Sequence, residues 1–321
     1  FDDSNNLLNT HYTNNSKNID KKIVENSYDS YGKLLRTTDY SNDDVGVCYD
    51  LEYDKYGNIN KKTYAQNNKN IEISSITNND ENKTNETIKI GTTQTSIEYD
   101  YSNKLDSKLT AIKFNNIVGQ TIDYDKLGRI NQTNIPKILT KQYNYLQKGD
   151  HSSNFIASEW FGNNKVIMDS LKYSYDMYGN IVAIKENGVE IVHYTYDELS
   201  RLIREDNKKL NKTTVFSYDI GGNILEKVEF MYTKKPTKEL VGGTRFAYHY
   251  PTSGWKDQLL KFNNENFVYD NLGNPTTYRD KTLTWKYGRQ LASFENITYK
   301  YNADGIRISK TNADNITTHF Y

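Results

Sequence analysis

The chain has 321 residues, of which 36% are hydrophobic, and its mean hydropathy is −0.86. Its 41 basic residues balance 41 acidic ones, and neither sign gathers into a long run, which argues against a nucleic-acid or membrane-surface role. No stretch approaches about 20 consecutive apolar residues, so no membrane insertion is predicted. The single Cys48 excludes an internal disulfide framework.

Tyrosine is the exception in this polar composition. The chain contains 28 tyrosines, and each ring buries on the order of 150–250 Å² while its hydroxyl stays hydrated or hydrogen-bonded. Tyrosine-rich strands therefore build a thin core that hydropathy scales undervalue. We expect a folded chain with an aromatic core.

One heptapeptide, Tyr-Asp-x-x-Gly-(Asn/Arg/Lys)-(Leu/Ile), recurs along nearly the whole chain. In chain order, its aspartates and glycines are Asp29 and Gly32, Asp54 and Gly57, Asp125 and Gly128, Asp176 and Gly179, Asp219 and Gly222, and Asp270 and Gly273. Looser copies begin at Phe1, Tyr99, Tyr196, Trp285 and Tyr301. In three of these the glycine is replaced, by Asn5, Asn103 and Ser200, and asparagine tolerates positive φ better than most residues.

The heptapeptide predicts a hairpin turn. Aspartate is favoured at the first position of a type I turn, and glycine at the fourth position supplies the left-handed residue of a bulge. Before most turns the residues alternate, as in Phe216 and Tyr218 around Ser217, which predicts strands with one polar face. The twelve aspartates and glycines of the six full copies are therefore the structural turn residues that we predict.

Three gaps between copies are about twice the usual spacing. They run from Tyr53 to Tyr99, from Tyr124 to Tyr175 and from Tyr218 to Tyr269. Turn-like sequences at Gly162-Asn163-Asn164 and Ser253-Gly254 lie in the second and third gaps. We therefore expect a degenerate hairpin in each gap.

A lone hairpin is marginal in water, so the hairpins are expected to stack in a continuous array. Right-handed twist disfavours a long flat sheet, so coiling is expected. The predicted fold class is all-β, with antiparallel hairpin repeats in a long coiled sheet that forms part of a spiral shell or barrel-like cocoon. We treat residues 1–321 as a single repeat region.

The repeats resemble the YD repeat of Rhs proteins, toxin-complex C components and teneurins. The resemblance covers nearly the whole chain, and it includes Trp255-Lys256-Asp257-Gln258-Leu259, Tyr269-Asp270-Asn271-Leu272-Gly273-Asn274-Pro275 and Gly288-Arg289-Gln290-Leu291, which are similar to the segment ahead of the Rhs core. It implies a hollow β-sheet shell around a C-terminal toxin polypeptide. The family's core often carries Asp-Pro motifs for self-cleavage, and this chain has no Asp-Pro dipeptide.

The expected function is therefore structural encapsulation by part of a secreted or cell-surface toxin. Since the chain starts inside one repeat and stops just after another, we expect a fragment of a longer polypeptide, without a separate toxin or autoprotease domain. The expected partners are the rest of that polypeptide and an enclosed C-terminal toxin, with no nucleic acid.

Catalysis and cofactor binding are not predicted. Cys48 and the five histidines His11, His151, His193, His249 and His319 form no recognisable catalytic or zinc motif, so we predict no enzyme, metal or cofactor. The repeated aspartates offer too few oxygens per turn for calcium, which needs about six to eight. A surface carbohydrate-binding or adhesion module is the alternative, with Trp160, Trp255 and Trp285 as possible glycan-stacking rings.

Overall fold

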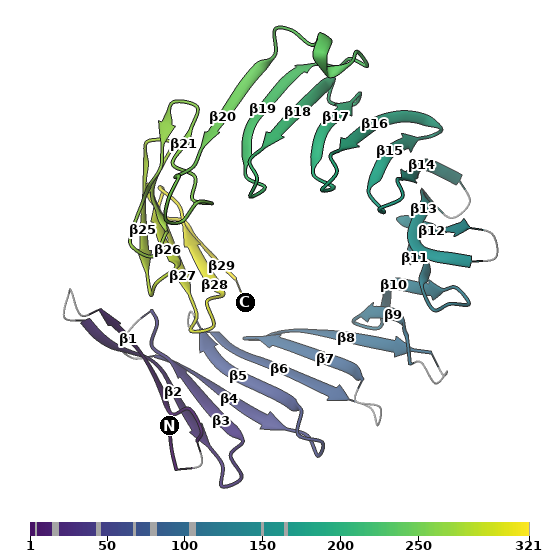
Figure 1. Ribbon diagram of the computed structural model, residues 1–321. Helices are drawn as coiled ribbons and strands as arrows, with labels where there is room; N and C mark the ends of the chain where they lie inside the picture. The colour runs from purple at the N-terminus through teal and green to yellow at the C-terminus, as the bar shows by residue number, and fades with distance from the viewer. Residues whose placement is uncertain are drawn as a thin grey trace. The chain divides into compact units, whose positions relative to one another are not determined.

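Antiparallel strands built on the heptapeptide make up the structure, a computed structural model (Figure 1). It describes residues 1–320 except 4, 15–18, 43–45, 67–68, 78–81, 103–106, 149–150 and 164–165. Within these residues, β1–β22 form one sheet of 22 strands and β23–β29 form a second sheet of seven. Paired strands follow one another along the chain, as consecutive hairpins do. The prediction of an all-β chain of antiparallel hairpin repeats in a long sheet is confirmed.

The chain divides into two compact units, residues 1–117 with 269–321 and residues 118–268. The strands of the first unit are β1 (Asn9–Asn14), β2 (Ile19–Tyr28), β3 (Leu34–Asp39), β4 (Val47–Tyr53), β5 (Ile59–Gln66), β6 (Lys69–Thr77), β7 (Lys83–Ile90), β8 (Thr93–Tyr101), β9 (Leu109–Phe114), β24 (Pro275–Tyr278), β25 (Lys281–Lys286), β26 (Gln290–Phe294), β27 (Ile297–Tyr301), β28 (Arg307–Thr311) and β29 (Thr317–His319).

The second unit contains most of the regular hairpins. Its strands are β11 (Ile130–Ile135), β12 (Leu139–Lys148), β13 (His151–Asn163), β14 (Val166–Tyr175), β15 (Ile181–Glu186), β16 (Val189–Tyr196), β17 (Leu202–Asn207), β18 (Lys212–Tyr218), β19 (Ile224–Met231), β20 (Thr244–His249), β21 (Lys261–Phe262) and β22 (Glu265–Asn266), with the 3-10 helix η2 (Thr237–Glu239) between β19 and β20. Two strands, β10 (Ile117–Tyr124) and β23 (Val268–Tyr269), cross the unit boundaries. No described helix is both long enough and apolar enough to cross a bilayer.

The first tyrosine of each repeat pairs with the Leu or Ile that ends it, and the ladder shifts by one residue just before that tyrosine. This is seen where Tyr175 pairs with Ile181 and where Tyr218 pairs with Ile224. One extra residue in one strand is a β-bulge, which increases the local twist. The bulge therefore comes from the heptapeptide itself.

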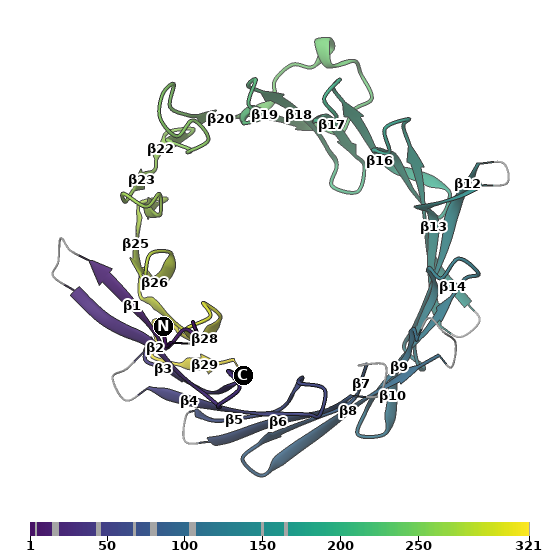
Figure 2. The same cartoon turned by 60° about the horizontal axis from the view of Figure 1, so that its bottom comes forward.

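The core of each unit is thin. Figure 2 shows the strands β11–β20 of the second unit as a single layer. Among the described residues the buried apolar side chains are Ile23, Ile71, Ala111, Ala183, Val192 and Val228, all of them small or β-branched aliphatic residues. The repeat tyrosines are half-buried instead, as at Tyr196 and Tyr218. Partial burial of many rings replaces a deep core, as the composition predicted.

Hairpins occupy all three long gaps, which confirms that each hides a degenerate copy. Thr77 pairs with Lys83 in the first gap and Tyr145 with Ile156 in the second, each beside a register shift. In the third gap His249 pairs with Lys261 across a longer connection that contains Ser253 and Gly254. Gly162 and Asn163 are the last residues of β13, next to the following connection from β13 to β14, and Asn164 lies outside the described residues.

The copy that the sequence placed at Tyr99 begins two residues later. Tyr101 pairs with Leu109 beside the register shift, and the Ser102 amide donates to the Lys108 carbonyl. The substitution at Asn103 falls outside the described residues. Tyr99 and Tyr101 have the same period-2 alternation, so the alternation alone does not distinguish them.

Candidate functional site

The heptapeptide turn is closed by its aspartate. At Asp176, carboxylate Oδ1 accepts hydrogen bonds from the amides of Tyr178 and Asn180, both at 2.9 Å, and Oδ2 accepts one from Asn180 Nδ2 at 2.9 Å. The Gly179 amide donates to the Asp176 carbonyl at 3.3 Å, and Gly179 has a φ of +88°. One side chain thus satisfies two amides that point into the turn.

The same geometry recurs at the other full copies. Each aspartate accepts the amide four residues later at 2.8–3.0 Å, and each glycine has positive φ; these pairs are Asp29 and Gly32, Asp54 and Gly57, Asp125 and Gly128, Asp219 and Gly222, and Asp270 and Gly273. In the looser copy at Tyr196, Ser200 takes the glycine position with a φ of +59°. Asn302 and Asn312 replace the aspartate in two turns near the end of the chain, and the second of these was not identified from the sequence.

Hydrogen bonding keeps these turn carboxylates ionised. The side-chain and backbone amides of Asn180 lower the pKa of Asp176 from its usual value. A bond from Thr77 lowers the pKa of Asp54, the Arg201 amide lowers that of Asp197, and Asn223 lowers that of Asp219. Four turns therefore prefer the charged carboxylate.

Acid is expected to destabilise the sheet through these turns. Because the folded pKa is lowered, the stabilisation is complete above the unfolded value of about 3.9 and is lost as pH falls through the folded pKa. The urea midpoint should therefore fall steeply below about pH 4, and Asp176→Asn should reduce that fall. Glu198→Gln, at an exposed position of the next turn, is the control; an equal reduction from both variants would contradict the assignment.

Tyrosine hydroxyls connect each repeat to the one before it. The first tyrosine of a repeat donates to the carbonyl of the residue that ends the preceding repeat, at 2.6–2.9 Å; these pairs are Tyr28 with Leu7, Tyr53 with Leu34, Tyr145 with Ile130, Tyr175 with Ile156, Tyr196 with Ile181 and Tyr218 with Leu202. Burial raises the pKa of Tyr175, Tyr196 and Tyr218, so these hydroxyls stay protonated as donors. The repeated tyrosine is therefore both core and connector.

Tyr218→Phe is expected to lower the free energy of unfolding by about 0.5–1.5 kcal/mol, because the Leu202 carbonyl loses its donor while the ring stays in place. Chemical denaturation measures the loss. Tyr178→Phe is the matched control, since that ring is exposed on a turn. Equal effects from the two substitutions would show that the hydroxyl bond contributes nothing.

The three tryptophans have different surroundings. Trp285 is half-buried and its Nε1 donates to the Pro275 carbonyl at 2.6 Å, so it replaces the repeat tyrosine as connector. Trp160 is half-buried on β13, and Trp255 is 53% exposed. Trp160 and Trp255 belong to the second unit and Trp285 to the first. Glycan stacking on these rings remains a prediction.

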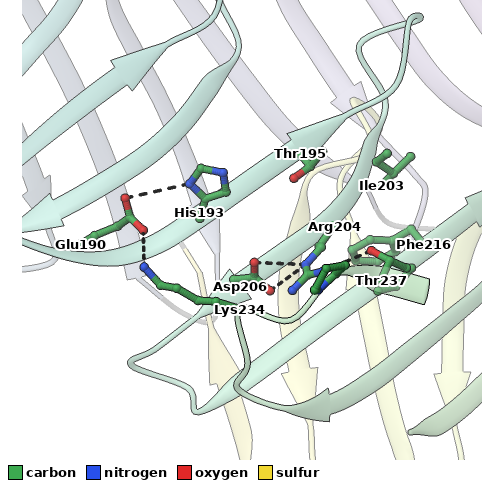
Figure 3. A pocket seen from close by; sticks show the side chains of 11 residues that line it. Glu190, His193, Thr195, Ile203, Arg204, Asp206, Phe216, Lys234 and Thr237 are labelled. Atoms are coloured by element: carbon green, nitrogen blue, oxygen red, sulfur yellow. Dashed lines mark hydrogen bonds and ion pairs between the residues drawn. The ribbon is translucent and has the colours of Figure 1, made fainter. Parts of the chain in front are cut away.

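A cavity of about 710 Å³ lies in the second unit, beside the connection from β19 to β20 (Figure 3). Its lining residues are Glu190, His193, Thr195, Ile203, Arg204, Asp206, Val215, Phe216, Lys234, Pro236 and Thr237. Glu190 contacts Lys234 at 3.2 Å and lies 4.0 Å from His193. Apolar side chains from β17 and β18 complete the lining.

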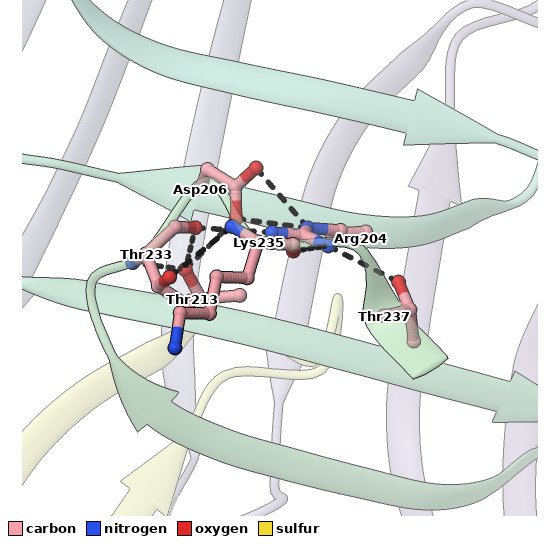
Figure 4. Close-up of polar contacts among 6 residues, drawn as sticks. All are labelled: Arg204, Asp206, Thr213, Thr233, Lys235 and Thr237. Atoms are coloured by element: carbon pink, nitrogen blue, oxygen red, sulfur yellow. Dashed lines mark hydrogen bonds and ion pairs between the residues drawn. The ribbon is translucent and has the colours of Figure 1, made fainter. Parts of the chain in front are cut away.

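A buried polar cluster fastens the same connection to the sheet (Figure 4). Arg204 Nε contacts both carboxylate oxygens of Asp206, at 2.9 and 3.1 Å, and its terminal nitrogens donate to the carbonyls of Thr233 and Lys235. Thr213 Oγ1 lies 2.8 Å from the same carboxylate. Residues 232–243, which we call the strap, are therefore held by a buried ion pair.

In the first unit, the last repeats contact the first ones. The Ala303 amide donates to Asp39 Oδ2 at 2.6 Å, and the Tyr287 hydroxyl donates to the Ser41 carbonyl at 2.7 Å. Asn42 Nδ2 donates to the Tyr301 carbonyl at 2.5 Å. We call these contacts the seam. It joins residues more than 240 positions apart in the sequence, and Asp39 and Ser41 are buried in it.

Two of the residues considered for catalysis or metal binding have polar side-chain neighbours. His11 contacts Asp20 at 2.8 Å on the surface, and Cys48 Sγ lies 3.6 Å from Thr38 Oγ1. Through the part of the chain that is described, no group of three or more His, Cys, Asp or Glu side chains is placed to hold a metal ion. The side chain of His151 lies outside that part.

The fold matches solved toxin structures. A chain of the TcdB2-TccC3-Cdc42 crystal structure superposes with a TM-score of 0.75 at 14% identity, over 95% of this chain and 18% of the other. A chain of TcdB2-TccC3 matches with the same TM-score at 13% identity, over 97% and 18%. The chain has a YD-repeat fold of the Rhs type. The YD-repeat chain also matches a chain of the Photorhabdus luminescens Tc holotoxin pore, with a TM-score of 0.67 at 12% identity, over 95% of this chain and 17% of the other.

One curated relative agrees with this assignment. The tRNA3(Ser)-specific nuclease WapA of Bacillus spizizenii is 28% identical to the YD-repeat chain over 133 residues, which are 39% of this chain and 5% of the relative. No protein-family profile matches the chain. The YD-repeat chain thus spans a small part of each of these proteins, and the likeness concerns the fold.

Proposed function

We propose that the chain is part of a shell wall that encloses or carries a toxin polypeptide, within a secreted or cell-surface protein. The observation that carries the proposal is the match to TccC3-containing chains over 95% of this chain. The curated relative is named as a tRNA-specific nuclease, and the likeness covers 5% of its length. A nuclease and a segment similar to this chain are therefore parts of one protein, which supports the proposal. The role of this segment is mechanical, with no enzymatic activity of its own.

The local chemistry suits a wall. Backbone groups are paired along consecutive ladders, turns are closed by aspartates, and tyrosine hydroxyls connect neighbouring repeats. Such an array depends on nearest-neighbour contacts, so it extends by adding hairpins without a new core. In the first unit, the seam adds contacts between residues that are distant in sequence.

Protease access to an attached polypeptide tests the proposal. A short unstructured peptide with a protease site is fused after residue 321, and its cleavage is compared with that of the free peptide. Enclosure predicts cleavage at least about tenfold slower, and the seam variant Asp39→Ala with Tyr287→Phe should restore faster cleavage. Equal rates for fused and free peptide, with intact β circular dichroism, would reject encapsulation by this segment.

A further inference from the structure

Exposed apolar side chains stand at the tips of the heptapeptide turns. In the second unit the turns 125–129, 176–180, 197–201 and 219–223 lie at one edge of the sheet, because alternate turns of an antiparallel meander share an edge. We call this the YD edge. It presents Leu127, Tyr178, Leu199 and Ile220, which are 66–103% exposed. Single exposed apolar residues are ordinary, whereas a row of them indicates an interaction surface; Leu127, Tyr178 and Leu199 each lie two residues after the turn aspartate, and Ile220 lies one residue after it.

The opposite edge of this unit is also apolar. The turns 136–138, 187–188 and 208–211 form what we call the counter edge, and exposed Ile138, Val189 and Leu210 lie in or directly next to them. Alternate turns lie about two strand spacings, or roughly 9.6 Å, apart on both edges. The two edges therefore match in spacing and in chemistry.

The seam in the first unit shows how such edges join. The turns at Tyr287 and Ala303 are on the YD side of their hairpins, and they contact Ser41 and Asp39, at the connection from β3 to β4 on the counter side. The Tyr287 ring packs edge-to-face on Tyr12, with 5.4 Å between centroids. An aromatic turn tip on a YD edge thus already binds a counter edge of the same kind of sheet.

We infer that the YD edge of the second unit docks on the counter edge of a second copy of this chain, with the same pairing of edges as at the seam but through apolar tips. One tyrosine tip that buries about 150 Å² and three aliphatic tips that bury about 100 Å² each give about 450 Å² per partner, which is in the size range of a weak, transient interface. The 41 basic and 41 acidic residues leave no net charge to keep copies apart. Since the two edges differ, the contact is head-to-tail and builds open stacks.

Sedimentation velocity over a range of concentrations tests this inference. The unaltered chain should form dimers and larger stacks, and association should persist at 0.5 M salt because the contact is apolar. Tyr178→Lys with Leu199→Lys should weaken association at least about tenfold. Glu198→Lys, which adds the same charge at an exposed position of that edge, should not. A chain that is monomeric throughout, or equal weakening by both variants, would overturn the inference.

Mixing two variants tests the head-to-tail arrangement. The counter-edge variant Val189→Lys with Leu210→Lys should weaken self-association by a similar factor when it is alone. An equimolar mixture with the YD-edge variant should give dimers and nothing larger, because each chain then offers one intact edge. Failure of the mixture to associate, with both variants folded by circular dichroism, would reject edge-to-edge docking.

Discussion

Arg204→Ala is expected to lower the free energy of unfolding of the second unit by about 3–5 kcal/mol. The Arg204 and Asp206 side chains are each only 10% exposed, so the substitution leaves a buried carboxylate without its cation. It also removes the donors to the Thr233 and Lys235 carbonyls that hold the strap. Urea unfolding measures the overall loss, and hydrogen exchange of residues 232–243 measures release of the strap.

Two further variants separate this explanation from general damage. Lys234→Ala removes an ion pair whose lysine is 68% exposed, and it should cost less than about 1 kcal/mol. Arg204→Met with Asp206→Leu removes both charges, and it should recover much of the stability while the strap still exchanges quickly. The explanation fails if Arg204→Ala costs no more than Lys234→Ala.

The heptapeptide turns were predictable because their chemistry is local. Asp176 binds amides two and four residues ahead, and Gly179 supplies positive φ within the same seven residues. The hydroxyl bond of Tyr218 was not specified, because its acceptor on Leu202 lies 16 positions earlier and only strand register brings it close. The sequence indicated a half-buried ring with a bonded hydroxyl, without indicating the acceptor.

Degenerate copies were harder to locate. Thr77 stands where other repeats have tyrosine, and it keeps a polar contact by donating to Asp54 at 2.8 Å. The connection that follows Tyr101 is longer than the heptapeptide. The expected distance from the first tyrosine to the turn residue therefore favoured Tyr99 as the start of this copy. In both places backbone pairing preserves the repeat while the side chains that identify it change.

The strap cluster and the seam depend on distant contacts. Arg204 and Asp206 are two apart on a strand, which places them on the same face, and opposite charges with that spacing were the available signal. On an exposed strand the same two residues would form an ordinary surface ion pair. The ion pair is buried here because the strap covers it, and the local sequence does not indicate that cover. The seam pairs Asp39 with Ala303, which are 264 positions apart, and no local pattern predicts this contact.

Gly179→Ala is expected to destabilise the sheet by about 2 kcal/mol or more, and Gly222→Ala by about 1 kcal/mol. Both glycines have φ near +90°, so both substitutions carry the cost of a left-handed residue with a Cβ. A Cβ at Gly179 would also lie 2.9 Å from the Phe155 ring, whereas one at Gly222 meets nothing within 4 Å. Urea unfolding of the two variants measures the difference.

Phe155→Leu provides the coupling test for this pair of turns. The Phe155 ring is 46% exposed and packs on Tyr175 with 5.1 Å between centroids, so moving it away from a new methyl group would weaken that ring contact. Combined with Gly179→Ala, Phe155→Leu should cost less than the sum of the two single changes, whereas with Gly222→Ala the costs should add. Additivity in both combinations would assign the whole effect to backbone strain. A non-additive result for Gly179 alone would show that the recurring geometry of the turn also fixes how closely the preceding repeat packs against it.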